Sequence, residues 1–295
     1  MNTFDIPVGD WAATGVQWIV TNLSGLFGFL RRLFIDMYDA VHTVLSGPWL
    51  LTTILIAVLA LVVRGPVMAI GSAAGLTLIV GMNQWENAMA SLALVIVAAV
   101  IAIAISVPLG IAAAKHRTTS AVIRPVLDLM QTLPAFVYLI PALLLFRIGV
   151  APGIVATIVF AMAPGVRFTE LGIRQVDKEV VEAGHAFGAH PRRILRQIQL
   201  PLALPTIMAG INQIIMLSLS MVVIAALVGA GGLGQDIVGG LNRLDTALGV
   251  EAGLAVVIIA IILDRLTSSL GRGTGLFAKV SARIKAKKKQ PEGNS

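Results

Sequence analysis

Seven long apolar segments leave this chain little choice of fold. They cover residues 45–63, 66–82, 89–114, 122–146, 150–166, 205–229 and 250–266, and charged residues are rare inside them. A helix needs roughly 20 apolar residues to cross a bilayer. We therefore expect an all-α polytopic membrane protein with about seven transmembrane helices. The segments 66–82 and 150–166 are short, and they would fit a thin bilayer or partial burial against other helices.

The composition excludes the soluble alternatives. Hydrophobic residues make up 57% of the 295 residues and charged residues 13%, and the mean hydropathy is +0.90. A soluble domain is roughly half apolar and about a quarter charged. The charge is too sparse to cover a water-facing surface, which excludes a soluble enzyme, a disordered chain and, despite the net charge of +7, a nucleic-acid binder. The chain has no cysteine, so disulfides, thiol catalysis and cysteine metal sites are excluded as well.

The basic residues indicate the orientation in the membrane. With the C-terminus inside, the cytoplasmic side holds all but four of the 22 Lys and Arg residues, the exceptions being Arg31, Arg32, Arg147 and Arg243. Cytoplasmic loops of membrane proteins carry an excess of Lys and Arg. We expect a cytoplasmic C-terminus and, with seven spans, an N-terminus outside.

The two ends of the chain differ from the transmembrane domain expected over 45–270. In the external segment 1–44, apolar residues such as Val16, Leu23 and Phe34 recur at helical spacing between polar ones. This predicts an amphipathic helix in the membrane interface, with an eighth span as the alternative. The basic cytoplasmic tail, 271–295, carries Lys285, Lys287, Lys288 and Lys289. It is either a disordered tail or a contact for anionic membrane lipid, worth ~1 kcal/mol per basic residue.

One cytoplasmic loop, 167–204, is long and polar enough to build a structure outside the membrane. Residues 178–189 suit a short helix, and Pro191 fits the first turn of a second helix, where its missing N–H costs nothing. We call this helix–turn–helix the elbow. It has an apolar face and nothing of its own to pack against, so we expect it to dock into another protein.

The elbow carries a spaced motif: Glu182-Ala183-Gly184, then Gly188, then Ile198 and Leu200-Pro201. This pattern resembles the EAA loop of ABC-importer permeases, E-A-A-x3-G-x9-I-x-L-P, with Gly184 in place of the second Ala. We expect that glycine to leave the docking face open. Residues 128–141, 200–213 and 218–234 resemble permeases of the glycine betaine/proline betaine importers, and the resemblance covers about residues 85–265.

The resemblance implies a type I ABC-importer permease in a bacterial inner membrane. It implies a homodimer of two permease copies, two cytoplasmic ATPase subunits that hold ATP and Mg, and an external substrate-binding protein. This chain would then bind no cofactor and have no catalytic residue; it would import glycine betaine, proline betaine or a related quaternary-amine osmoprotectant. The residues implied to couple it to the ATPase are Glu182, Ala183, Gly184, Gly188, Ile198, Leu200 and Pro201.

Two alternatives stay open at this point. An ABC permease for another small solute, such as choline or an amino acid, would share the same motif. An ion-driven secondary transporter would favour paired intramembrane acids and would need no docking elbow.

Polar residues within the spans are candidates for a substrate pathway: Gln131, Thr132, Tyr138, Asn212, Gln213, Ser218 and Ser220. The alternative is helix–helix hydrogen bonding, worth ~0.6 kcal/mol each. Asp128 stands one turn after Arg124 and is expected to pair with it or to act in gating. Asp264 beside Arg265 is expected to form a structural pair at a span end.

The glycines Gly229, Gly231, Gly232 and Gly234 satisfy G-x-G-x-x-G, but a dinucleotide site needs this turn within a βαβ unit. We interpret them as a candidate gate or re-entrant turn in which backbones approach closely. The four histidines are scattered, so no metal site is expected. Aromatic residues are only 5% of the chain, which predicts no tight aromatic cage for a quaternary ammonium and places selectivity in the external binding protein.

Overall fold

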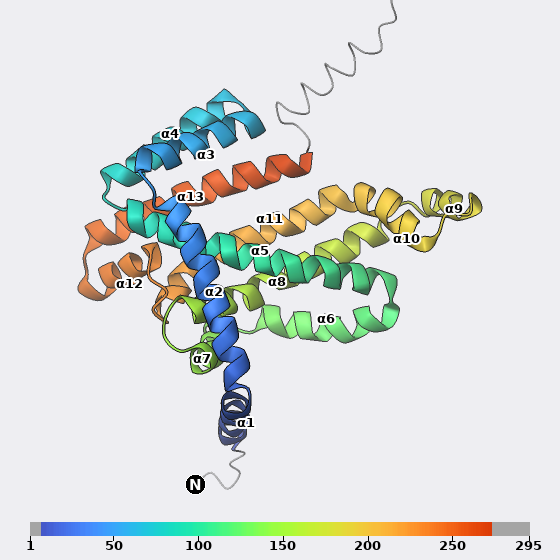
Figure 1. The fold of residues 1–295 in the computed structure, drawn as a ribbon, viewed down its shortest axis with the longest axis horizontal. Coiled ribbons are helices and arrows are strands. Elements are labelled where there is room, and N and C mark those ends of the chain that lie inside the picture. Colours follow the sequence, from blue (N-terminus) through green and yellow to red (C-terminus); the bar gives the residue numbers. More distant parts are fainter. Residues whose placement is uncertain (1–6, 273–295) are drawn as a thin grey trace, which may run out of the picture.

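The computed structural model describes residues 7–272, and every regular element in that range is a helix (Figure 1). The lysines of the predicted basic tail lie outside these residues. The helices are α1 Val8–Asn22, α2 Ser24–Leu45, α3 Trp49–Arg64, α4 Pro66–Gly81, α5 Trp85–Lys115, α6 Arg117–Thr132, α7 Ala135–Phe146, α8 Val150–Arg174, α9 Lys178–Ala186, α10 Pro191–Ile194, α11 Leu200–Ala226, α12 Leu233–Arg243 and α13 Thr246–Arg272.

Three long helices, α5, α8 and α11, run side by side through the centre of the molecule (Figure 1). Glycines allow their backbones to approach. A Cβ added at Gly165 of α8 would lie 2.5 Å from both Ser106 Oγ of α5 and Ile214 Cδ1 of α11. Small residues at helix interfaces are typical of membrane helices, because lipid offers no hydrophobic drive for helix association. The three helices therefore form one closely packed unit.

The expected class of fold, an all-α membrane protein, is confirmed. By length and composition, four helices can cross a membrane, and the bent pairs α2–α3 and α6–α7 raise the number to as many as six. Two of the four are α5 and α13, and a third is the continuous helix from Pro191 through a π-helical turn to Ala226. We expected seven; the 16-residue α4 is too short to be counted in this way.

The segment 122–146, expected as one span, is two helices. The helices α6 and α7 meet at a bend of 101°. Leu133 is extended, with φ −70° and ψ 135°, because the residue before a proline is disfavoured in the helical region. Pro134 thus ends α6 and turns the chain into a broken span.

The span expected over 150–166 is longer than predicted. Helix α8 continues to Arg174, and the helix that ends in α11 begins at Pro191, so both enter the stretch 167–204 that was expected to be a loop. Charged residues at Arg167, Glu170 and Arg174 ended the apolar pattern but not the helix. The elbow is consequently mounted directly on two long helices.

The N-terminal amphipathic segment forms two helices, which meet at Leu23. Helix α2 is not an isolated surface helix, because Phe34, Met37, Tyr38 and Val41 pack against the core that α5, α8 and α11 share. It runs steeply across α5 and turns by 93° into α3 (Figure 1).

Candidate functional site

The elbow is built from two capped helices and a glycine turn. Asp177 Oδ1 accepts a hydrogen bond from Glu179 N at 2.9 Å and caps α9, and His190 Nδ1 accepts one from Arg192 N and caps α10. Such caps satisfy the first backbone N–H groups of a helix. Between the helices, Gly188 has φ +72°, a left-handed conformation that commonly ends helices at a glycine.

We expected Gly184 to leave the docking face of the elbow open, but this glycine faces inward. A Cβ added there would lie 3.0 Å from Ile198 Cδ1 and 3.3 Å from Ile194 Cγ1. The glycine therefore lets α9 pack closely against the second helix of the elbow. The expectation was wrong because the motif reveals spacing but not which face of α9 each residue occupies.

The outer face of the elbow presents the other motif residues. Glu182, Ala183 and Gly188 are exposed, and Ile198 and Leu200 are half-buried at the root near the exposed Pro201. Phe187 is 91% exposed, which is unusual for an aromatic side chain on a polar surface. The sequence analysis did not single out Phe187.

A buried carboxylate ties the base of the elbow to two other helices. Glu170 of α8 is 6% exposed, and its Oε1 accepts from Ser120 Oγ at 2.7 Å, Arg124 Nη2 at 3.1 Å and Arg174 Nε at 2.9 Å. Arg174 also donates to the carbonyl of Ala113 at 2.8 Å. The sequence prediction missed Glu170 because it placed this residue in a loop.

The expected pairing of Asp128 with Arg124 is wrong. Asp128 pairs with Arg167 of α8, while Arg124 pairs with Glu170. The two neighbouring ion pairs line a pocket of about 320 Å³ between α6 and α8. Arg124 and Asp128 each pair with a residue of α8 instead of with each other, because α6 lies alongside α8.

Asn212 forms a hydrogen-bonded contact between α11 and α13. Its Nδ2 donates to Asp264 Oδ1 at 3.1 Å, and its Oδ1 accepts from Thr267 Oγ1 at 2.6 Å. The predicted Asp264–Arg265 pair is wrong, because Asp264 is bonded to Asn212 and no ion pair joins it to Arg265 within residues 7–272. Asn212 thus follows the helix-packing alternative.

The other candidate pathway residues lie on two elements. Thr132 Oγ1 donates to Leu129 O within the last turn of α6, whereas Tyr138 Oη donates to Met130 O and so joins α7 to α6 across the bend. On α11, Ser220 is exposed and donates to Met216 O, whereas the Ser218 hydroxyl is buried without a partner in the described part of the chain. The exposed amides are Gln131 and Gln213.

The glycine turn after α11 is closely packed. Gly229, Gly231 and Gly232 have φ values from +72° to +83°. A Cβ at Gly234 would lie 2.3 Å from Val222 O, and one at Gly232 would lie 2.4 Å from Ser91 Oγ, which accepts from Leu233 N. These contacts agree with a turn in which backbones approach closely.

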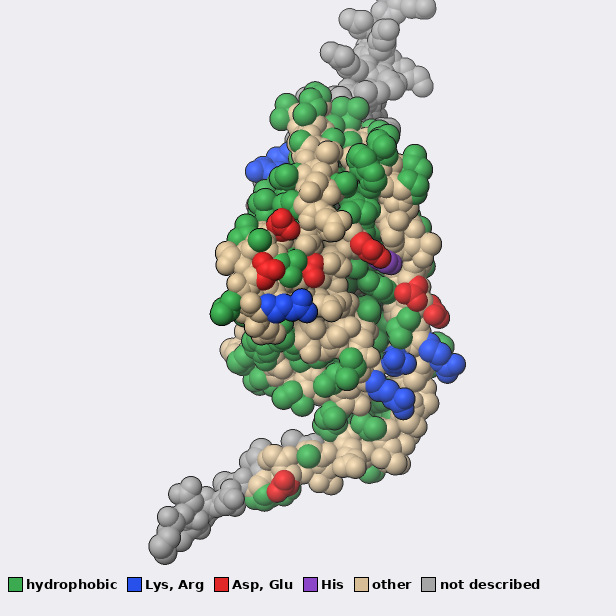
Figure 2. All heavy atoms as spheres, turned by 90° about the vertical axis from the view of Figure 1, so that its left-hand side faces the viewer, with side chains coloured by type: hydrophobic (Ala, Val, Ile, Leu, Met, Phe, Trp, Pro, Cys, Tyr) green, Lys and Arg blue, Asp and Glu red, His purple; other side chains and the backbone are tan. Residues whose placement is uncertain are grey.

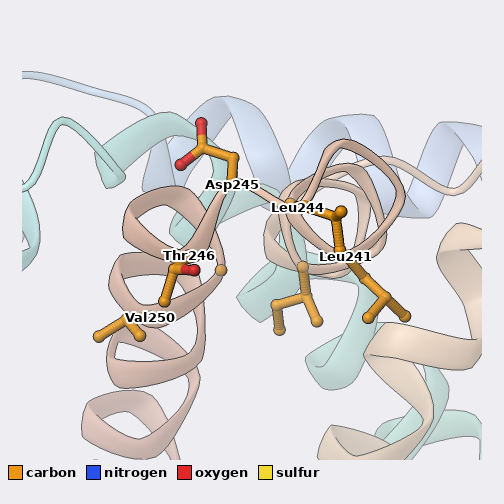
Figure 3. Close-up of a pocket in the computed structure, with 8 residues that line it drawn as sticks. Leu241, Leu244, Asp245, Thr246 and Val250 are labelled. Carbon is orange, nitrogen blue, oxygen red and sulfur yellow. The ribbon is translucent and has the colours of Figure 1, made fainter.

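The end of the molecule opposite the elbow presents apolar side chains together with both acidic and basic ones (Figure 2). Leu241 and Leu244 from the end of α12 and Val250 from α13 surround a pocket of about 400 Å³ (Figure 3). Leu244 is 87% exposed. Among residues 7–272, no cluster of three His, Asp or Glu residues could hold a metal ion.

Comparisons with known proteins agree with this geometry. Residues 106–274 match the family described as binding-protein-dependent transport system inner membrane component. The chain is 45% identical over 268 residues to the glycine betaine/proline betaine transport system permease protein ProW of Escherichia coli, covering 90% of this chain and 76% of that one. It is 45% identical over 266 residues to the glycine betaine transport system permease protein OpuAB of Bacillus subtilis, covering 90% and 94%.

A solved structure supports the fold. An inward-facing structure of the MetNI methionine ABC transporter is similar with a TM-score of 0.56 at 22% identity, over 62% of this chain and 92% of that chain. At this identity the likeness concerns the fold alone.

Proposed function

The chain belongs to the family of binding-protein-dependent transport system inner membrane components, and on that premise we propose that it forms the membrane passage of an ATP-driven importer for glycine betaine, proline betaine or a related quaternary amine. It is a transport subunit and not an enzyme, since ATP is hydrolysed on a separate ATPase subunit. The proposed substrate class rests on the permease relatives at 45% identity.

The single observation that carries the mechanism is the mounting of the elbow on α8 and α11. Both helices pack against α5, and both end at the elbow without a flexible linker longer than a few residues. A push on the elbow by a closing ATPase dimer would therefore move the cytoplasmic ends of two core helices together. Glu182, Phe187 and Gly188 form the contact with the ATPase in this proposal.

In this proposal the substrate passage is polar and binds the substrate weakly. Gln131, Gln213 and Ser220 are exposed on α6 and α11, and they would face the passage. Aromatic residues are 5% of the chain, so a cage that grips a quaternary ammonium is not expected. A weak site suits transport, because the passage must release what it admits.

A second copy of the chain would cover apolar surface that is exposed here. Val122 and Val126 of α6 are 71% and 53% exposed, and Ile140 of α7 is 66% exposed. We place the two ATPases at the cytoplasmic elbows and the external binding protein at the opposite end, near the pocket of Figure 3. The N-terminus is outside and the C-terminus cytoplasmic in this arrangement.

An ion-driven carrier is not favoured. Its acids would have to bind and release the driving ion, whereas Glu170 and Asp128 are each paired with arginine. A permease for choline or an amino acid would share the elbow, so only the transported solute distinguishes it from a betaine permease.

Uptake of labelled glycine betaine tests the cargo. The assembled transporter is expressed in cells that lack their own betaine importers, and competing solutes are added in excess. We expect uptake that proline betaine reduces strongly and that amino acids leave unchanged. Uptake of an amino acid or choline without uptake of either betaine would contradict the proposal.

A further inference from the structure

A recessed pocket of about 290 Å³ lies between α2 and the turn that joins α7 to α8. It holds three arginines, Arg31 and Arg32 from α2 and Arg147 from the turn. The remaining lining residues are Val20, Ser24, Phe27, Gly28, Leu144 and Leu145. Ile148, the next residue along, packs near Gly229, so the pocket lies near the glycine turn and away from the elbow.

These arginines have no acidic partner. No Asp or Glu lines the pocket, and the ion pairs within residues 7–272 involve other arginines. Arg31 Nε is buried without a hydrogen-bond partner, and Arg32 Nε donates only to Gly28 O, at 3.4 Å. Three like charges around one recess repel one another, and a buried guanidinium N–H without an acceptor costs free energy. An anion with several oxygen acceptors would resolve both problems.

Arg147 is held in an unusual backbone conformation. Its φ is 61° and its ψ is 173°, a region that glycine adopts and other residues avoid at a cost of ~1–3 kcal/mol. A glycine could end α7 here without that cost. Arg147 lines the pocket in this strained conformation, which is the kind of position that strain marks as functional.

The surroundings of the pocket select an anion with a hydrocarbon tail. Phe27, Leu144 and Leu145 form its apolar wall. On the adjoining surface of α2, Leu26 and Phe29 are 51% and 58% exposed. A soluble anion would leave this apolar surface uncovered, whereas lipid acyl chains would cover it.

We propose that this pocket binds the phosphate of an anionic glycerophospholipid, with the acyl chains along α2 and α7. Given the proposed orientation, the site belongs to the outer leaflet. A lipid bound in this pocket would hold α2 against the turn before α8.

Lipid retention by the assembled full-length transporter tests the site. The complex is purified from a phosphatidylglycerol-containing membrane, and lipid bound per complex is measured by mass spectrometry. The double variant Arg31→Gln/Arg147→Gln should bind phosphatidylglycerol about tenfold or more weakly. The matched control is Arg243→Gln, an exposed arginine expected on the same side, which should retain it. Equal retention by the double variant would overturn the proposal.

Thermal melting distinguishes a bound lipid from other ligands of this pocket. Added phosphatidylglycerol should raise the Tm of the wild type but not of Arg147→Gly, which removes the side chain together with the backbone strain. If Arg147→Gly still responds to the lipid, the site is refuted. A rise in Tm produced equally by glycerol phosphate would refute a lipid in favour of a soluble anion. Weaker affinity for the external binding protein with unchanged lipid would refute it in favour of a protein contact.

Discussion

At the scale of residues, Glu170 ties the end of α8, next to the elbow, to α6. Its carboxylate bonds to side chains from α6 and to Arg174 in the last turn of α8, three residues before Asp177, which caps α9. Because the carboxylate is buried, losing its charge leaves two arginines without their counter-charge. Asp128 forms a similar pair but is 63% exposed, where ion pairs contribute little.

The two acids should therefore respond differently to neutralisation. We expect Glu170→Gln to destabilise the permease by about 1–3 kcal/mol and to lower uptake per ATP hydrolysed. Asp128→Asn is the matched control, with a change of about 0–1 kcal/mol and near-normal uptake. Thermal unfolding and uptake by the assembled transporter measure both effects. Normal stability in Glu170→Gln, or complete loss of uptake in assembled Asp128→Asn, would contradict these roles.

Residue partners were the least predictable part of the site. The sequence placed Asp128 one turn from Arg124, but the side-by-side packing of α6 and α8 offered each a partner on another helix. Asn212 illustrates the same point, since its partners Asp264 and Thr267 are more than 50 residues away. Partners of this kind depend on helix packing, which local spacing does not reveal.

At the scale of elements, the elbow depends on small residues at two positions. Gly184 packs inward against the flexible ends of Ile194 and Ile198, whereas Gly188 supplies the left-handed turn. The residue pattern over 178–189 and the proline at 191 predicted both helices. It did not predict the inward position of Gly184.

Enlarging Gly184 should displace α9. Gly184→Ala brings a Cβ to 3.0 Å from Ile198 Cδ1, a flexible side-chain end that can shift, so uptake should be nearly normal. Gly184→Val overpacks the contact at a cost of about 1–3 kcal/mol and should lower uptake in transporters that still assemble. Uptake assays on the two variants, matched for the amount in the membrane, compare them directly. Full activity in Gly184→Val would show that this packing is not needed.

The glycine turn offers a matched pair on α12. A Cβ at Gly234 would lie 2.3 Å from the backbone oxygen of Val222, whereas one at Gly239 meets nothing within 4 Å. We expect Gly234→Ala to destabilise the protein by about 3 kcal/mol and Gly239→Ala to be neutral or stabilising. Thermal unfolding distinguishes the two. Equal stability would refute the close packing of this turn.

Elements were predictable where the apolar pattern was continuous and less so where it changed. The long apolar run of α5 was predicted nearly in full. The end of α8 was missed because its last two turns carry charges on a helix that stays partly buried. The bend at Pro134 was present in the sequence as a proline, but a proline within an apolar run also occurs inside a continuous helix, as Pro108 does in α5.

At the scale of the whole molecule, the two ends have different chemistry. One end carries the elbow with its exposed Phe187, and the opposite end carries both acidic and basic side chains and the pocket between α12 and α13 (Figures 1 and 2). The closely packed α5, α8 and α11 connect them. This arrangement fits the proposed importer, in which the ATPase acts at the elbow and the substrate enters at the opposite end.

The central claim is that the elbow transmits the work of the ATPase to the membrane helices. Its most direct test is to measure ATP hydrolysis and glycine betaine uptake in the same vesicles. A Cβ added at Gly188 meets nothing within 4 Å in this chain, so a bulky side chain there would extend from the surface that we propose contacts the ATPase. The turn itself requires φ +72°, which Asn tolerates better than other residues. We predict that Gly188→Trp abolishes uptake coupled to hydrolysis while Gly188→Asn largely preserves it; unchanged coupling in assembled Gly188→Trp would contradict the account.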